Sequence, residues 1–351
     1  MRRRSFLALS AAALAAPAWS ATGARFVTAA SRPDNSTWLV GLSDSAEVLF
    51  QIPIPARGHA AATHPHQAQA VAFARRPGRF AVILDCLTGR ETARLTAPEG
   101  RHFYGHGAFT ADGRYLLTTE NDYDGPDGRI GIWDVTAGYT RIDEVPSGGI
   151  GPHEIRRLPD GGFAVANGGI QTHPDYQRAK LNLPTMQPNL TYFDPQGQIT
   201  EQAAPPADLH QNSIRHIDVD RAGRVVMALQ WQGDPRQPVP LAASHRRGEE
   251  LRFHPHPDTA KLRQYGGSVA VAGDGSEFAV TGPKGDHILY FRGADAVPAG
   301  GDALPQASGV AQMGDGLAIT RTGGLTLRQN GRMVDHATGD NWTWDNHLVP
   351  I

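Results

Sequence analysis

Short apolar runs separated by turn residues make up most of this chain. The runs are rich in β-branched and aliphatic residues, and Gly, Asp or Pro bounds each of them, while no long stretch carries apolar residues at helical spacing. Runs of this kind are typical of β-strands. Clear examples lie at residues 80–84, 115–119, 163–166 and 224–229. The pattern predicts an all-β chain and argues against a helical domain.

The turns recur at regular intervals along the sequence. Turns at residues 110–114, 158–162, 220–224, 273–276 and 313–316 each join a short strand to a stronger one, as Asp-Gly hairpin turns do. A third and a fourth strand then complete each unit. Four strands in about 40 to 50 residues is the pattern of a β-propeller blade, which buries its faces only against its neighbours. Six such blades begin near residues 58, 105, 152, 215, 267 and 308.

The two ends of the chain supply the parts of one more blade. Predicted strands at residues 25–29, 37–41 and 47–51 lack a first strand, and a single strand near 345–350 lacks its other three. Pairing them would close the ring and remove exposed sheet edges. We therefore expect residues 22–351 to form one seven-bladed β-propeller, closed by pairing of the N-terminal strands with the C-terminal strand.

Residues 1–21 have the features of an export signal. A charged start at Arg2, Arg3 and Arg4 precedes an apolar stretch at 8–16, and candidate small-residue cleavage sites follow at 16–18 and 18–20. The apolar stretch is shorter than the roughly 20 residues that cross a bilayer. The arginines before Ser5 and Phe6 resemble the twin-arginine export motif, with an ordinary secretory signal as the alternative. We expect a periplasmic protein whose mature form has no membrane span.

Composition excludes several classes of function. The chain has 33 basic and 35 acidic residues and a formal net charge of −2, which gives no support to a nucleic-acid or anionic-membrane partner. Its single cysteine, Cys86, cannot form an internal disulfide. The sequence lacks a Walker loop, a dinucleotide-binding fingerprint, a nucleophile elbow and a zinc-protease motif. Hydrolysis by a standard catalytic triad is therefore not expected. As to oligomeric state, we expect a monomer.

Histidine recurs at one structural position of the repeat. Counting back seven residues from the turn after the first strand reaches a histidine in three blades, and matching histidines lie in the first blade and on the closing strand. The same count reaches Ser268 in the fifth blade and Gly309 in the sixth. The five histidines in register are His59, His106, His153, His216 and His347.

This register predicts a transition-metal site. The innermost strands of a propeller line its central channel, so side chains at one level converge on the axis. Neutral imidazoles suit Cu, Zn, Ni or Fe, and a cluster without thiolates or many carboxylates argues against Ca or Mg. The small residues of two blades would leave a coordination position open to an outside ligand. In the alternative interpretation each histidine bonds a neighbouring backbone and is purely structural. His210, six residues before His216, is a possible extra ligand, but for this residue the structural interpretation is favoured.

Loops between the second and third strands should surround the channel mouth. The longest spans residues 170–189, and loops of this length are uncommon unless functional or disordered. It would either cover the channel or form a surface flap. Arg76, Lys284 and Arg321 could attract an anionic ligand. The ligand-contacting candidates on this face are Glu120, His173, Trp231, Lys284 and Arg321.

Several short motifs resemble one known family. They lie at residues 104–107, 119–123, 151–154, 167–175, 180–186, 213–216, 231–233 and 345–348. They are similar to those of a proteobacterial family of exported propellers, a domain of unknown function often encoded beside imelysin-type iron-regulated proteins. The resemblance implies a periplasmic role in iron or copper handling, with iron-uptake proteins as partners. The nitrous oxide reductase propeller is similar in fold and in its histidine-bound copper, but this chain lacks a cysteine-rich copper domain, so respiratory reduction is not expected.

Three hypotheses follow from the sequence. The leading one is a periplasmic metal-binding propeller, with copper or iron held by the histidine cluster. It would serve metal uptake by passing on the ion, or act as a metal-dependent oxidoreductase by changing the ion's oxidation state. The second is a metal-free platform that binds a small anionic ligand or a partner protein over the channel mouth. The third is a structural scaffold.

Overall fold

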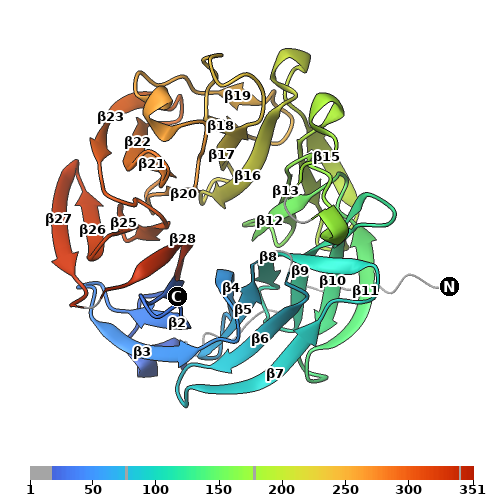
Figure 1. The fold of residues 1–351 in the computed structure, drawn as a ribbon, viewed down its shortest axis with the longest axis vertical. Coiled ribbons are helices and arrows are strands. Elements are labelled where there is room, and N and C mark those ends of the chain that lie inside the picture. The colour runs from blue at the N-terminus through green and yellow to red at the C-terminus, as the bar shows by residue number, and fades with distance from the viewer. Residues whose placement is uncertain (1–17, 76–77, 177–178, 340) are drawn as a thin grey trace.

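Seven four-stranded sheets stand around a central axis in the computed structural model, which describes residues 18–75, 78–176, 179–339 and 341–351 (Figure 1). Neighbouring strands pair antiparallel within each sheet, for example β8 with β9 and β20 with β21. The short-strand pattern thus predicted the fold class correctly: the chain is an all-β, seven-bladed propeller.

The four strands of each blade follow one another from the axis outward. Blade 1 is β4 (Gly58–Thr63), β5 (Gln69–Ala74), β6 (Phe80–Asp85) and β7 (Arg90–Thr96); blade 2 is β8 (Arg101–Phe109), β9 (Tyr115–Asp122), β10 (Asp127–Asp134) and β11 (Thr140–Pro146); blade 3 is β12 (Pro152–Arg157), β13 (Phe163–Asn167), β14 (Asn189–Phe193) and β15 (Ile199–Ala203). Blade 4 is β16 (Asn212–Val219), β17 (Val225–Trp231), β18 (Ala242–His245) and β19 (Arg252–Phe253); blade 5 is β20 (Ser268–Val271), β21 (Glu277–Gly282), β22 (His287–Arg292) and β23 (Val297–Ala303). Blade 6 is β24 (Val310–Met313), β25 (Gly316–Arg321), β26 (Gly324–Gln329) and β27 (Arg332–Ala337); blade 7 is β28 (Thr343–Pro350), β1 (Phe26–Ser31), β2 (Thr37–Leu42) and β3 (Val48–Pro53). Short 3-10 helices lie at η1 (Ala18–Thr22), η2 (Pro174–Tyr176), η3 (Leu183–Thr185), η4 (Ala207–Leu209) and η5 (Thr259–Leu262).

The ring closes at blade 7, where the two ends of the chain meet. Strand β28 pairs antiparallel with β1, from Phe26 opposite Pro350 to Ser31 opposite Thr343. Its Trp344 and Leu348 pack into the core shared with blade 6, and Val349 packs into the core shared with blade 1. The predicted closure by the C-terminal strand is confirmed.

The hydrophobic core is divided among the interfaces between blades. Each of seven apolar clusters draws its side chains from two neighbouring blades; Val226 of blade 4, for example, packs with Phe278 of blade 5. Innermost strands such as β20 are buried throughout, while outer strands such as β3 are mostly half-buried or exposed. This arrangement leaves the axial ends of the innermost strands free to carry polar side chains.

The first described residues pack against the propeller. Trp19 in η1 is buried, and its indole N–H donates a 2.9 Å hydrogen bond to the carbonyl of His64 in blade 1. Residues 1–17, which hold most of the predicted export signal, lie outside the described residues. Within the described part of the chain, no helix has the length and apolar character needed to span a membrane.

Candidate metal centre

The five histidines predicted to be in register meet at the propeller axis. Each lies on the innermost strand of its blade, and all five are buried. Nine of the ten pairs of ring centroids are separated by 4.5 to 6.4 Å, so the imidazoles form one cluster and do not stand on opposite walls of a channel. The rings come from β4 (His59), β8 (His106), β12 (His153), β16 (His216) and β28 (His347).

A break in strand register accompanies each histidine. Pairing of the innermost strand with its neighbour shifts between Gly58 and Ala61 in blade 1, and similar shifts lie at or beside the histidine in blades 2, 3, 4 and 7. Blades 5 and 6, which contribute no histidine, pair without a shift at this strand. Because β-bulges re-aim side chains, these irregularities turn the five imidazoles toward the axis.

Gly105 makes room for one of the rings. Its φ is +100°, and a Cβ at this position would lie 2.6 Å from Cδ2 of His59. An L-residue would therefore be strained and would displace the imidazole. Gly309 plays a related part in blade 6, where a Cβ would lie 2.5 Å from the amide nitrogen of Leu348. The close approach of this backbone explains why blade 6 brings no side chain to the cluster.

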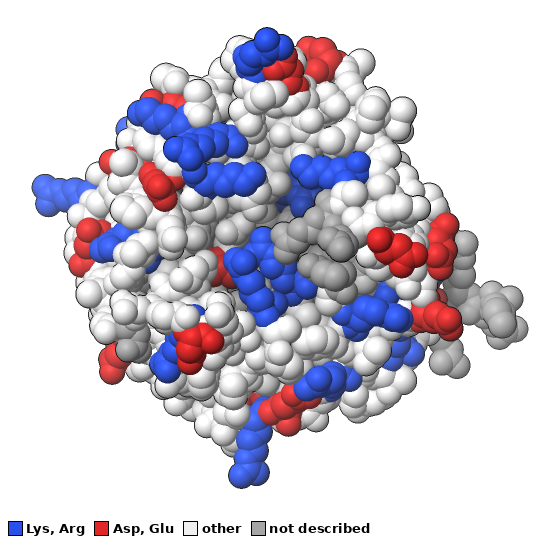
Figure 2. Space-filling view, in the orientation of Figure 1, with Lys and Arg blue, Asp and Glu red and all other residues white. Residues whose placement is uncertain are grey.

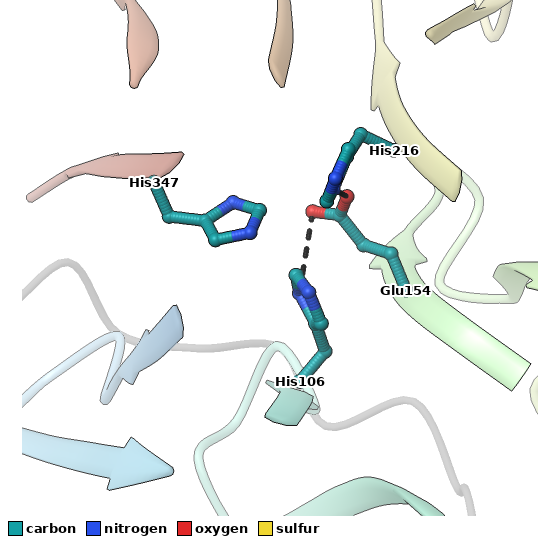
Figure 3. Close-up of side chains that lie close together, drawn as sticks. All are labelled: His106, Glu154, His216 and His347. Carbon is teal, nitrogen blue, oxygen red and sulfur yellow. Dashed lines mark hydrogen bonds and ion pairs between the residues drawn. The ribbon is translucent and has the colours of Figure 1, made fainter. Parts of the chain in front are cut away.

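Glu154, in the position after His153, orients the imidazole of His216. Its carboxylate accepts a hydrogen bond from Nδ1 of His216 at 3.2 Å and from the backbone N–H of Ile217 at 3.1 Å. It also lies 3.7 Å from Nδ1 of His106 and pairs with Arg156 at 3.0 Å. Figure 3 shows Glu154 between these rings, with His347 facing them from the opposite side. A carboxylate that bonds one ring nitrogen leaves the other nitrogen of that ring to bind an ion.

Asp345 does the same for His59 from the closing strand. It accepts from Nδ1 of His59 at 3.2 Å and from the backbone N–H of Asn346 at 2.8 Å, and it pairs with Arg57 and Arg75 at 3.0 and 3.1 Å. Although burial opposes ionisation, His59 and the two guanidinium groups hold the pKa of Asp345 well below its usual value. The carboxylate is therefore charged and fixes the orientation of the ring.

Three buried ring nitrogens have no hydrogen-bond partner among the described residues. They are Nε2 of His106, Nδ1 of His153 and Nε2 of His347. A buried polar atom without a partner costs about 1 to 3 kcal/mol, and three in one cluster require an explanation. Burial, reinforced by neighbouring rings, lowers the pKa of four of the imidazoles well below its usual value, those of His106, His153, His216 and His347. They are neutral at neutral pH, the form that binds metals.

The donor atoms are close enough to share an ion. Two groups each have ligand atoms within 4.8 Å of one another: His106, Glu154, His216 and His347, and His59, His106 and His153. Bonds of about 2 Å from imidazole nitrogen to a metal place opposite ligands about 4 Å apart, so small side-chain movements suffice. His106 belongs to both groups. His210 is not part of the cluster, since its ring bonds the carbonyl of Ala207 in the cap of η4.

A cavity of about 630 Å³ opens above the cluster, and His59, His153 and His216 form part of its wall. Two of the predicted ligand-contacting residues, Trp231 and Lys284, line this cavity. Sequence reasoning missed the rest of its charged lining: Arg57, Arg75, Lys180, Arg215 and Arg263. Arg215 immediately precedes His216 and Arg57 lies two residues before His59, and that proximity was the signal available for these two.

Glu120, His173 and Arg321 do not line this cavity. Glu120 is fully buried over Gly131 inside blade 2, where Arg141 of an outer strand pairs with it at 2.8 Å. Arg321 is drawn outward by Asp335 of β27 at 3.2 Å. His173 faces the turn after β9, with Asp124 at 3.6 Å. Arg76 lies outside the described residues.

The described residues of the loop over 170–189 are folded back on the propeller rather than extended. Asn182 accepts from the backbone N–H of Gln171 at 2.7 Å and donates to the carbonyl of Gly169 at 2.9 Å. Met186 is fully buried, while Leu181 is exposed. Among the described residues of the loop, Lys180 reaches the cavity. The described part of the loop thus packs on the surface of the propeller through Met186 and, through Lys180, also borders the cavity above the histidine cluster.

Changing Asp345 to asparagine should weaken metal binding about 10- to 100-fold, the usual effect of removing a carboxylate that orients a ligating histidine. The amide lacks the charge that holds Nδ1–H of His59. Competition with a chromogenic chelator would measure the affinity. Asp335→Asn, which alters an exposed ion pair with Arg321, is the matched control. Wild-type affinity in a folded Asp345→Asn protein would show that this carboxylate does not orient a metal ligand.

The fold and site together define a seven-bladed propeller with a buried histidine cluster on its axis. Residues 52–351 match the family described as "Protein of unknown function (DUF1513)", and the chain belongs to this family. Among curated proteins, none matches the sequence.

Solved structures with a similar fold have little sequence in common with the chain. A hydrazine synthase chain of Kuenenia stuttgartiensis is 11% identical with a TM-score of 0.63, covering 88% of this chain and 96% of its own. The periplasmic gluconolactonase PpgL of Pseudomonas aeruginosa is 13% identical with a TM-score of 0.61, covering 92% and 99%. The WD40 repeats of RRP9 are 14% identical with a TM-score of 0.54, covering 93% and 94%. At these identities the likeness concerns the propeller fold alone.

Proposed function

We propose that this protein binds a transition-metal ion through its axial histidine cluster and serves metal uptake or redox handling in the periplasm. The observation that carries the proposal is the set of unpartnered, buried ring nitrogens on His106, His153 and His347 within one cluster. An ion held by either of the two ligand groups would bring together two of these residues, His106 with His347 or His106 with His153. A purely structural role explains them less well, because buried polar atoms in folded proteins usually have a hydrogen-bond partner.

Copper is the preferred ion, with iron, the other metal that the family resemblance implies, as the alternative. Imidazoles dominate the donor set, the only cysteine lies elsewhere in the core of blades 7 and 1, and for nitrogen ligands affinity among divalent ions peaks at copper. Carboxylate oxygens of Glu154 are engaged by Arg156 and by backbone. An ion held by neutral imidazoles can leave the site and be passed on, or it can change its oxidation state while its ligands stay bound.

The test is the metal content of protein purified without an affinity tag that binds metal. Elemental analysis should find about one copper or iron ion per chain, or metal-free protein should take up about one ion when titrated with Cu²⁺, Fe²⁺ or Zn²⁺. Copper should bind most tightly. Protein that holds no ion after purification and takes up none at a molar excess would refute the proposal.

Export to the periplasm is part of the same proposal. The sequence of residues 1–21 supports it, and the packing of Trp19 favours one of the two candidate cleavage sites. The buried Trp19 side chain and its hydrogen bond to His64 belong to the folded propeller, so cleavage after Ser20 would remove a core residue. We expect cleavage after Ala18.

Amino-terminal sequencing of the exported protein should therefore begin at Trp19. Changing Arg3 and Arg4 to lysine should retain the precursor in the cytoplasm if the twin-arginine route carries it. A mature chain that starts beyond Trp19 would contradict the predicted cleavage site. Normal export of the variant with lysine at positions 3 and 4 would contradict the twin-arginine route.

A further inference from the structure

The cavity above the histidine cluster has a one-sided charge. Among the described residues, its lining includes six cationic side chains and no carboxylate: Arg57, Arg75, Lys180, Arg215, Arg263 and Lys284. Figure 2 shows Lys and Arg side chains gathered around the central opening of the ring, while acidic side chains lie mainly toward the rim. Cations of one sign in a concave site raise the local concentration of anions.

The cations come from several directions. Arg57 and Arg75 belong to blade 1, Lys180 to the loop of blade 3 and Arg215 to blade 4, while Arg263 and Lys284 border blade 5. A single small anion would touch one wall of a cavity of about 630 Å³. An occupant that contacts opposite walls must carry charge at more than one point.

Two of these cations lack a carboxylate partner among the described residues. Arg263 forms none of the ion pairs present there, and Lys284 lies over the ring of Tyr265, with its ammonium 4.4 Å from the ring centroid. Arg263 and Gln264 both have positive φ, 50° and 57°, a conformation that is costly for residues other than glycine and that often marks binding sites. This turn presents both side chains to the cavity.

The charged wall is joined to the histidine cluster. Asp345 bonds His59 on one side and Arg57 and Arg75 on the other. His59, His153 and His216 border the cavity directly. A carboxylate held by the cations would thus lie beside the imidazoles, where one of its oxygens can complete the coordination of an ion.

We propose that this cavity binds a small organic anion with two or three carboxylates, next to the metal ion. Guanidinium groups match carboxylates in two-point hydrogen bonds, and Trp231, Tyr104 and Tyr265 supply apolar walls for a carbon skeleton. The contact with the ion rests on the function proposed above, while the contacts with the cations do not. The protein would therefore recognise a metal together with a polycarboxylate.

The probe is tricarballylate, which carries the three carboxylates of citrate without the hydroxyl that makes citrate a strong chelator. Calorimetric titration of the full-length mature protein should show binding that weakens as salt is raised. The double variant Arg263→Gln/Lys284→Gln should bind at least about tenfold more weakly, as expected when two charge-assisted contacts are lost. Its metal content should be unchanged, because neither side chain contacts an imidazole.

Arg252→Gln/Arg332→Gln, on outer strands, is the matched control and should bind like the wild type. In copper-loaded protein, tricarballylate should shift the visible absorption of the ion. Inorganic phosphate should bind much more weakly. Equal affinity in the cavity variant and the wild type, or phosphate binding as tight as tricarballylate, would overturn the proposal. Tricarballylate binding to a protein that takes up no metal would instead refute the metal site and leave the anion site standing.

Discussion

A variant with His106 and His153 both changed to alanine should be purified with almost no bound metal, whereas the wild-type protein should carry about one ion per chain. His106 belongs to both groups of potential ligand atoms, and His153 belongs to one. The double change therefore leaves neither group complete. Elemental analysis of the two proteins, each loaded in parallel with Cu²⁺, measures the effect directly.

The matched control removes two buried histidines elsewhere in the propeller. His64 bonds backbone groups beside blade 1, and His245 bonds the hydroxyl of Tyr192 in the core of blades 3 and 4. The pair His64→Ala/His245→Ala should lower the thermal midpoint but keep the ion. Full metal content in the His106→Ala/His153→Ala variant, or near-zero content in all three proteins, would end the metal hypothesis.

The position of the cluster was predictable because a propeller repeats. Hairpin turns fixed the phase of each blade, and a constant count back from the turn reached His106, His153 and His216, which the structure places within 5.8 Å of one another between ring centroids. The closing strand placed His347 in the same ring. Repetition converts sequence spacing into spatial position without any knowledge of side-chain packing.

The supporting residues were not predictable in the same way. Asp345 and Glu154 act through register breaks that carry no clear sequence signal. In a regular strand Asp345, two positions before His347, would point to the same face of the sheet as His347, whereas Glu154, immediately after His153, would point to the opposite face. Bulges remove this parity, so which neighbour reaches the ring is decided by the local backbone.

Residues at the mouth show a second limit of sequence reasoning. Position along a strand placed Glu120 and Arg321 near the opening, but partners on outer strands determine where these long side chains go. Arg141 holds Glu120 over Gly131, and Asp335 holds Arg321 at the edge of its blade. Trp231 and Lys284 have no such outer partner among the described residues and do line the cavity. Their part in binding stays a prediction.

Deleting residues 343–351 should prevent the chain from forming a stable monomer. The deletion removes β28, the innermost strand of blade 7, and leaves β1 with an unpaired edge. Trp344, Leu348 and Val349 are buried in two different cores. At about 1.5 to 3 kcal/mol for each large apolar side chain, their loss is on the order of 6 kcal/mol, comparable with the whole stability of about 5 to 15 kcal/mol of a typical domain.

Gel filtration and thermal unfolding would measure the outcome, and two controls separate the strand from its functional side chains. Full-length His347→Ala keeps the strand and should fold while losing metal affinity. Deletion of Ile351 alone removes one backbone hydrogen bond to Arg25 and a partly buried side chain at the edge of the core of blades 7 and 1, and should lower the thermal midpoint only slightly. A synthetic peptide of residues 343–351 should restore a monomer to the truncated chain, because it supplies the missing strand edge. A truncated chain that elutes as a monomer and melts near the wild-type temperature would show that blade 7 is stable without its inner strand.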